Sequence, residues 1–294
     1  MLRAQSTSLT VTAAMTSRPA ASPDLLRQRY GSAPTSTEPT PADASHAVID
    51  QLLAHRSVRG FLDKPLAGGT LELLVAAAQS ASSSSNLQAW SVVAVEDAGR
   101  KARLSAIAGG QAHMRQAPLL LVWVADLSRL DRVAERRGDV ADANRFTELF
   151  LVAAIDAALA AQNAVIAAES LGLGTVYIGA LRNRVDQVAA ELILPPRSFA
   201  VFGLCVGHPD PARPASIKPR LPQSAVLHRE TYATLTEEQG VRDYDETMQA
   251  FQRTQAMPVQ PWSQQASQRV RGAASLSGRH VLAQWLRERG LMLD

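Results

Sequence analysis

Apolar and polar residues follow distinct periods along the chain, and these periods predict the secondary structure. Apolar side chains recur at helical spacing over residues 47–54, which predicts a short amphipathic helix that ends before His55. Thr70 can cap a second helix, and Trp90–Val95 alternates as a strand does. Residues 119–125 are nearly all apolar, which is typical of a buried central strand.

The longest apolar segment, from about residue 145 to 171, predicts a helix of roughly 40 Å at 1.5 Å per residue. Its few polar side chains, Asp156, Asn163 and Ser170, lie seven residues apart on one stripe. A helix that is apolar on most faces must be covered on most faces, and we expect a subunit interface. Asp156, Gln162 and Asn163 interrupt the run, so we do not expect it to span a membrane.

The rest of the chain mixes helices and strands. We expect a charged connection over residues 126–145. On the long helix, no histidine or second carboxylate predictably lies opposite Glu148, Asp156 or Glu169, so we expect these acids at the helix surface. The later elements are a turn and strand over 172–178, a helix over 185–192, a strand over 198–206, a proline-rich loop over 209–222, and helices near 237–253 and 277–289. Without a regular βαβ period, this order indicates the α+β class.

The N-terminal segment has a different composition. Ser, Thr, Pro and Ala make up 27 of residues 1–45, which predicts a disordered arm over residues 1–41 and a folded domain over 42–294. No acid appears before Asp24, and Arg3 and Arg18 are present, which loosely resembles a transit peptide, but a flexible tail or a misplaced start codon is the favoured interpretation.

Composition limits the function classes. The chain has 294 residues and a net charge of +3, so it offers no basic stripe for nucleic acid. The single cysteine, Cys205, lies in an apolar run and is interpreted as a buried thiol rather than a nucleophile. The six histidines lack metal-ligand spacing, and we expect a soluble, cytoplasmic protein.

Three polar segments could bind an anion. His55-Arg56-Ser57-Val58-Arg59 places two guanidinium groups three residues apart and could chelate a phosphate, although taken alone the segment favours a solvated helix end. Ser82–Ser85 exposes hydroxyl and N–H groups in a turn, or is only a linker. Lys218-Pro219-Arg220 lies in a proline-stiffened loop that could complete the site.

The glycine-rich segment 172–179 is not a dinucleotide-binding motif. Such a motif needs a strand before the glycines and a helix after them, whereas here a helix comes first. Gly172 is placed to end that helix, and Gly179 would let a flat ligand approach the backbone. No Gly-x-Ser-x-Gly nucleophile motif and no convincing acid–base pair is present.

Taken in order, these segments resemble the nitroreductase family, specifically its oxygen-insensitive NADPH nitroreductase and FMN reductase branch. The resemblance covers roughly residues 46–290. It is carried by His55–Arg59, the serines with Leu87-Gln88, Gly109-Gly110-Gln111-x-His113, Ala161-Gln162-Asn163-Ala164, Ala167–Gly174, Tyr177-Ile178-Gly179, Phe202–Cys205 and Lys218–Pro222.

The resemblance implies a nitroreductase-like α+β fold, with a central mixed sheet flanked by helices and a C-terminal helical extension. It implies an intertwined homodimer with FMN bound at the interface. The implied cofactor contacts are His55, Arg56, Ser57, Arg59, Ser83, Ser84, Ser85, Gln111, Tyr177, Ile178, Gly179, Lys218 and Arg220. Some of the contacts from the three serines and Gln111 could come from the partner subunit.

The resemblance also implies the reaction. Flavin carries the hydride in a ping-pong scheme, so no catalytic side chain is required: NADPH or NADH donates, and a nitroaromatic, a quinone or another flavin accepts. Arg279 matches an arginine near the acceptor, and Arg253 is the remnant of a basic loop that binds the NADPH 2′-phosphate. Ala180 replaces a usual glycine and Asn86 a possible aromatic residue.

These departures leave two further hypotheses open. The chain could bind flavin as a sensor or carrier without efficient turnover. Alternatively, it could bind some other phosphate through its arginines.

Overall fold

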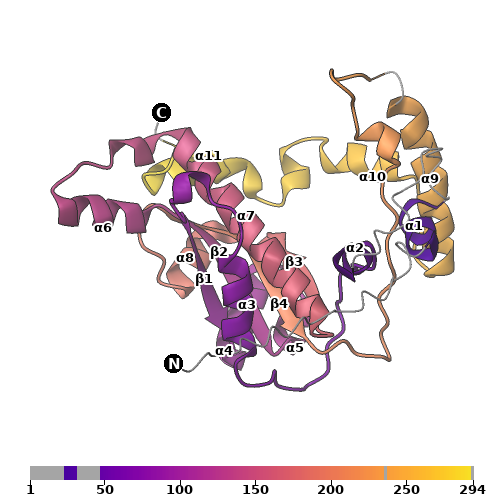
Figure 1. Ribbon diagram of the computed structural model, residues 1–294, viewed down its shortest axis with the longest axis horizontal. Helices are drawn as coiled ribbons and strands as arrows, with labels where there is room; N and C mark the ends of the chain where they lie inside the picture. The colour runs from indigo at the N-terminus through magenta and orange to yellow at the C-terminus, as the bar shows by residue number, and fades with distance from the viewer. Residues whose placement is uncertain (1–22, 32–46, 235–236, 293–294) are drawn as a thin grey trace, which may run out of the picture.

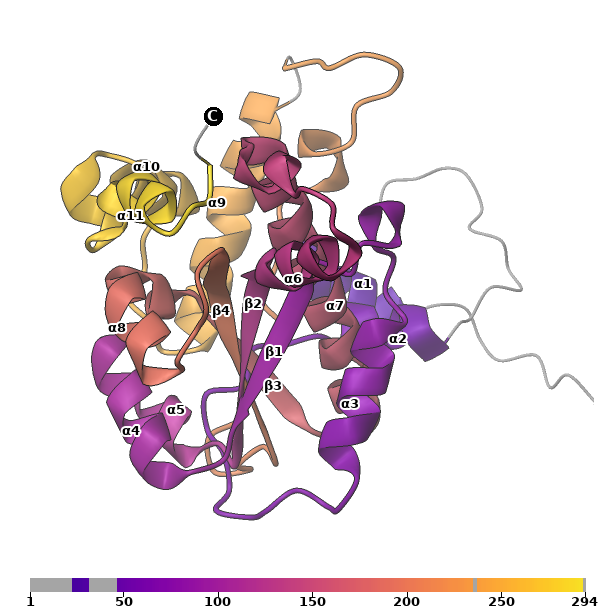
Figure 2. The ribbon, with the colours of Figure 1, turned by 90° about the vertical axis from the view of Figure 1, so that its left-hand side faces the viewer.

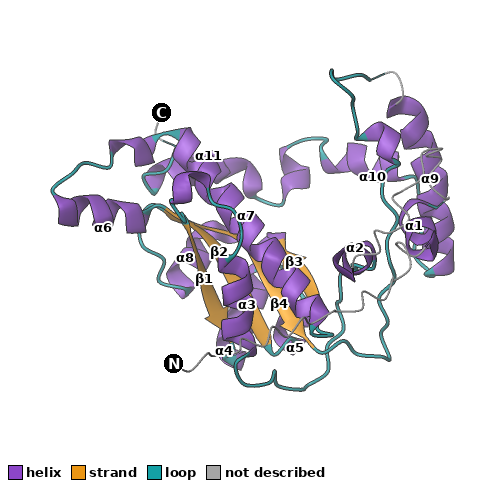
Figure 3. Ribbon diagram, viewed as in Figure 1, coloured by secondary structure: helices purple, strands orange, loops and turns teal. Residues whose placement is uncertain are grey.

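A computed structural model describes residues 23–31, 47–234 and 237–292, and its centre is a four-stranded sheet. The strands lie in the order β1-β2-β4-β3, and every pair is antiparallel (Figure 3). Their bounds are Trp90–Val95 (β1), Leu119–Asp126 (β2), Gly174–Ile178 (β3) and Ser198–Gly207 (β4). The α+β class is confirmed. The expected mixed sheet is wrong, because the four described strands pair only in antiparallel fashion. Between described residues, parallel pairing is limited to an isolated bridge of Ser57 with Thr175.

Helices cover both faces of the sheet. All eight residues of β2 are therefore buried. On one face, Leu120 and Val122 pack with α4, α5 and α8; on the other, Leu121 and Trp123 pack with α3 and α7 (Figure 2). The bounds are Thr70–Gln79 (α3), Ala98–Ile107 (α4), Ala112–Gln116 (α5), Thr147–Ser170 (α7) and Val185–Glu191 (α8). Strict alternation along β2 therefore divides the core into two layers.

Helix α7 is the predicted long helix. Small side chains, among them Ala153, Ala160 and Ala164, let it lie close to the sheet. By length and composition it could cross a membrane, yet this packed face is typical of a core helix in a soluble protein. The helix ends where Gly172 adopts a φ of 74° and its N–H donates to the carbonyl of Glu169 over 3.0 Å.

The other predictions for helices meet mixed outcomes. Helix α2 (Ala47–Leu53) and helix α9 (Glu237–Thr254) match them closely. The expected connection over residues 126–145 instead contains helix α6 (Ser128–Arg137), in which Leu130, Val133 and Ala134 recur at helical spacing among six charged residues. The predicted helix over 277–289 is shorter: α11 spans Leu282–Glu288, after the 3₁₀ turn η6, Arg279–Val281.

The region after β4 leaves the sheet and later returns to it. A loop leads to α9 and α10 (Trp262–Arg269), which Figure 1 shows set apart from the strands. The chain then comes back through α11, where the Trp285 ring packs 5.8 Å from Phe199 of β4, measured between centroids. The C-terminal extension is therefore fastened to the sheet at both of its ends.

Part of the predicted disordered arm is folded. Residues Pro23–Tyr30 form helix α1, and the side chain of Arg29 is buried, with 6% exposure. Composition averaged over the arm hid this helix, because a helix of eight residues is stabilised by tertiary contacts rather than by its own propensity. The rest of the predicted arm, 1–22 and 32–41, lies outside the described residues.

Candidate functional site

The segment after α2 lies along the start of β3. The Val58 N–H donates to the Thr175 carbonyl over 2.8 Å. A β-carbon on Gly174 would lie 2.7 Å from a Val58 methyl group, so this approach requires glycine. The His55 ring nitrogen Nδ1 lies 2.6 Å from Glu169 Oε1 at the end of α7. Glu169, expected at the helix surface, is therefore a partner that fixes this segment.

Arg59 and Lys218 share a cavity of about 330 Å³ beside this segment. Within the described residues, neither side chain forms a hydrogen bond or an ion pair. Burial lowers the pKa of Lys218, and the positive charges of Arg59 and Arg220 lower it further. Ser57, Phe251 near the end of α9 and Gln255 just after that helix complete the wall. Arg59 and Lys218 are both exposed to solvent, so their charges stay largely hydrated, and together they offer an anion two cationic partners at one cavity.

Histidine 113 adds an orphaned polar atom near the same charges. Its Nε2 is buried and has no hydrogen-bond partner among the described residues. Burial lowers the pKa of His113, and the nearby Arg59 charge acts in the same direction. Gln111, two residues earlier, turns its Nε2 back to the Ala108 carbonyl over 3.3 Å. In this structure the Gln111 amide therefore caps its own turn.

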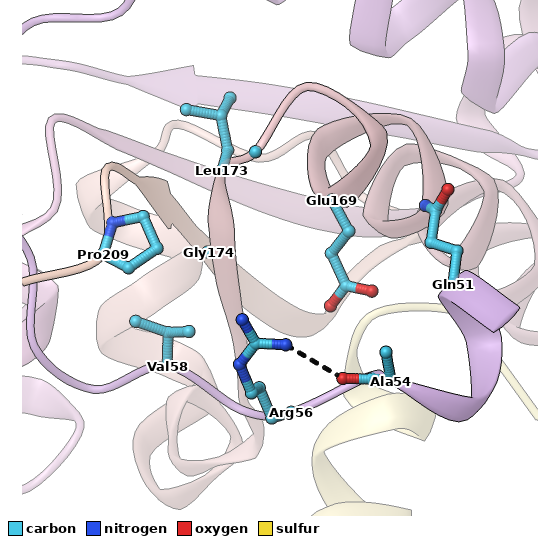
Figure 4. A pocket seen from close by; sticks show the side chains of 9 residues that line it. Gln51, Ala54, Arg56, Val58, Glu169, Leu173, Gly174 and Pro209 are labelled. Carbon is cyan, nitrogen blue, oxygen red and sulfur yellow. Dashed lines mark hydrogen bonds between the residues drawn. The ribbon is translucent and has the colours of Figure 1, made fainter. Parts of the chain in front are cut away.

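Arg56 faces a different cavity, of about 140 Å³. Figure 4 shows its guanidinium and the Glu169 carboxylate facing this space from opposite sides. Arg56 donates to the Ala54 carbonyl over 3.1 Å and is exposed. The structure therefore separates Arg56 from Arg59, although only three positions separate them in sequence.

Arg220 lines a third cavity, of about 590 Å³, which Lys218 borders as well. The Arg220 guanidinium donates to the Lys218 carbonyl over 3.3 Å, and Tyr244 and Trp262 form an aromatic wall. Lys218 thus lies between two cavities, and the loop it belongs to connects them.

The segment that ends β3 presents one aromatic residue. Tyr177 is 37% exposed, its hydroxyl donates to Gln162 Oε1 over 3.3 Å, and its ring meets Phe202 edge-on at 5.0 Å. Burial raises the pKa of Tyr177. Ile178 is buried, and a β-carbon on Gly179 would lie 3.3 Å from an Arg182 nitrogen. A substitution at Gly179 would therefore crowd the Arg182 guanidinium.

Asp156, expected at the helix surface, holds the serine turn. It is only 2% exposed, and it accepts hydrogen bonds from Ser83 Oγ at 2.7 Å, from Ser84 N at 3.2 Å and from Ala89 N at 3.3 Å. Ser85 is held in the left-handed region at a φ of 49°. A carboxylate within an apolar helix was the available sequence signal, but its partners lie some seventy residues earlier.

The serine turn and the Arg59 segment are therefore far apart within one chain. Asp156 anchors the turn and Glu169 contacts His55, and thirteen residues of helix separate these anchors by about 20 Å. The structure does not unite the predicted serine contacts with the predicted phosphate contacts in a single cavity.

The two candidate substrate residues also lie elsewhere. Arg279 Nε donates to Asn183 Oδ1 over 2.8 Å and lines a cavity of about 660 Å³ together with Arg182. Burial lowers the pKa of Arg279. Arg253 is exposed in the last turn of α9, two residues from Phe251 and from Gln255, which line the Arg59 cavity.

Comparison with known proteins places this geometry in a family. Residues 52–208 match the model of the nitroreductase family, and residues 218–294 match the model of its C-terminal domain. The chain belongs to the nitroreductase family. An FMN reductase (NADPH) of Bacillus subtilis is 42% identical over 222 residues, which are 74% of this chain and 88% of that protein. An NADPH-flavin oxidoreductase of Vibrio harveyi is 40% identical, covering 83% of this chain and 97% of that protein.

Solved structures confirm the nitroreductase fold. The NfrA1 nitroreductase from B. subtilis superposes with a TM-score of 0.78 at 38% identity, over 84% of this chain and 100% of that one. The NADPH:FMN oxidoreductase from Vibrio harveyi, complexed with NAD⁺, gives 0.75 at 38% identity, over 85% and 100% of the two chains. Helix α1 precedes the residues that the family model matches.

Proposed function

We propose that this nitroreductase-family protein is an FMN-dependent NAD(P)H oxidoreductase. The observation that carries the proposal is the pair of uncompensated cations, Arg59 and Lys218, at one cavity. The related proteins from Bacillus subtilis and Vibrio harveyi, an FMN reductase and an NADPH-flavin oxidoreductase, support the flavin and the nicotinamide donor.

The residues present fit the phosphate end of FMN. Arg59 and Lys218 would receive the phosphate, whose negative charge would offset the burial and the neighbouring positive charges that lower the pKa of Lys218. The orphaned His113 Nε2 and the Ser57 hydroxyl are further polar groups on that side. Tyr177 and its neighbours would lie beside the ring. FMN, when bound, supplies hydride transfer between the nicotinamide and the acceptor.

The remaining predicted contacts require a second chain. Leu151, Ile155 and Leu159 of α7 are 48%, 56% and 44% exposed and form one stripe, while α2 exposes further apolar residues. Within one chain the anchors of the serine turn and of the His55 segment lie about 20 Å apart along α7, so the serines would reach a phosphate cavity only if a homodimer that covers this stripe places them at the partner's cavity. We infer that Ser83, Ser84 and Ser85 act across the dimer.

The dimer is tested on this stripe. Ile155→Arg buries a charge in the contact and should produce monomers in sedimentation equilibrium, with loss of bound flavin. Val140→Arg is the matched control, because Val140 is 83% exposed and lies outside the stripe. An Ile155→Arg protein that remains dimeric would refute this interface.

We infer that a nicotinamide and an acceptor use the site in turn, in a ping-pong scheme. The acceptors would be nitroaromatics, quinones or flavins, and Arg279 would border the acceptor. Exposed Arg253 would contact the donor's 2′-phosphate, so Arg253→Ala should raise the KM for NADPH more than the KM for NADH. We also propose a cytoplasmic location, in keeping with a buried and unpaired Cys205.

Absorption spectroscopy tests the proposed function directly. The purified protein should bind FMN, and NADPH or NADH added anaerobically should bleach the flavin band, which a quinone should restore. Flavin binding without turnover by either donor would instead leave the sensor or carrier hypothesis. Failure to take up FMN would refute both and favour another phosphate ligand.

A further inference from the structure

Arg29 of α1 connects two segments of the candidate phosphate site. Its Nη1 donates to the Lys218 carbonyl over 2.9 Å, and its Nη2 donates to the carbonyls of Leu53 and His55 over 2.6 and 2.8 Å. In return, the Arg29 carbonyl accepts the Arg220 N–H over 2.8 Å. One buried side chain therefore ties the end of α2 to the Lys218 loop.

The guanidinium suits this position for a geometric reason. It is planar and carries five N–H donors in a fixed fork, so one group can bond two separate segments at once. A lysine ammonium is a point charge on a flexible stem and cannot reproduce this fork. Burial lowers the pKa of Arg29, and Arg220 lowers it further, so the three carbonyl contacts offset an unfavourable environment.

Helix α1 is itself fixed at a second point. Gly31 ends it with a φ of 77°, and the Gly31 N–H donates to the Arg27 carbonyl over 2.7 Å. A β-carbon on Gly31 would lie 2.7 Å from a methyl group of Thr247 on α9. Helix α1 thus sits against α9, whose far end lines the Arg59 cavity, and this support holds the Arg29 fork in place.

We propose that Arg29 is a positioning residue that sets the spacing between the cations of the His55–Arg59 segment and those of the Lys218–Arg220 loop. It would thereby set the affinity of the cavity for a phosphate monoester, without touching the phosphate itself. The proposal rests on the proposed function, since it assumes that the cavity receives the FMN phosphate. It assigns a role to a helix that lies before the residues matched by the family model.

FMN and riboflavin provide the test, because they differ only in the phosphate. The dissociation constants of both are measured by flavin fluorescence for the full-length protein and for the variants Arg29→Ala and Arg29→Lys. Arg289→Ala is the matched control: Arg289 also donates to two backbone carbonyls, those of Leu194 and Pro195, but at the opposite end of β4. Melting temperatures are recorded in parallel.

Both Arg29 variants should lower the preference for FMN over riboflavin by roughly tenfold, or about 1.4 kcal/mol. Arg289→Ala should lower the melting temperature and leave this preference unchanged. If Arg29→Ala does not fold, Arg29→Lys gives the same readout. A preference that is unchanged in the Arg29 variants, or that falls equally in the control, would overturn the proposal.

Arg59→Ala separates this proposal from the proposed function. If Arg59→Ala removes the FMN preference while Arg29→Lys keeps it, the positioning role alone is wrong. If Arg59→Ala keeps the preference, the phosphate does not bind in this cavity, and the assignment of the site fails with it.

Discussion

Removing the Asp156 carboxylate should destabilise the protein more than removing an exposed carboxylate does. Asp156→Ala leaves three donors without an acceptor: the Ser83 hydroxyl and the N–H groups of Ser84 and Ala89. The Ala89 N–H is buried, and an unsatisfied buried donor costs about 1–3 kcal/mol. The other two donors can be rehydrated at a smaller cost, so we expect a total loss of about 3 kcal/mol.

Urea unfolding of the flavin-free protein measures this loss, at one protein concentration for all variants because dimerisation would shift the midpoint. Asp97→Ala is the matched control. Asp97 also accepts a backbone hydrogen bond, from Arg100 N over 2.7 Å, but it caps an exposed helix end, where the loss is about 1 kcal/mol. If Asp156→Ala costs no more than Asp97→Ala, Asp156 does not hold the serine turn.

Three further predictions concern other parts of the chain. Gly174→Ala should cost about 1–3 kcal/mol in unfolding free energy and weaken FMN binding, whereas Gly68→Ala, with open space around it, should be neutral. Burial raises the pKa of Cys205 to about 12, so the thiol should resist a disulfide reagent until urea exposes it, and rapid labelling of the native protein would refute this. The free energy of unfolding should also fall as the pH rises from about 9 toward 12, because the thiol ionises first in the unfolded chain. Deleting residues 1–22 should preserve FMN affinity and deleting 1–31 should reduce it; equal affinities in a binding titration would contradict a role for α1.

The sequence predicted the elements whose periods are strong. Helix α7 and strand β2 were found because almost every position is apolar. Helix α6 was missed although Leu130, Val133 and Ala134 follow a helical period, because its six charged residues favoured a connection; α1 was missed because one composition was assigned to the whole arm. Composition averaged over a segment therefore conceals a short helix, even where the positions of its apolar residues follow a helical period.

The candidate site was only partly accessible from the sequence. Residue type marked Arg59 and Lys218, but nothing local shows that these two positions, about 160 residues apart, border one cavity while Arg56 faces another. Asp156 was interpreted as a surface residue, because its partners lie far away in sequence. Tertiary contacts decide such pairings, and one sequence does not display them.

Helix α7 fixes the distance and the relative direction of two carboxylates, Asp156 and Glu169, which hold the serine turn and the His55 segment. One residue inserted between them would rotate one carboxylate by about 100° relative to the other and add 1.5 Å of length. Either the serine turn or the His55 segment would then lose its anchor. The interval from 156 to 169 should consequently not tolerate a change in length, whereas exposed positions outside the stripe of Leu151, Ile155 and Leu159 should tolerate substitution.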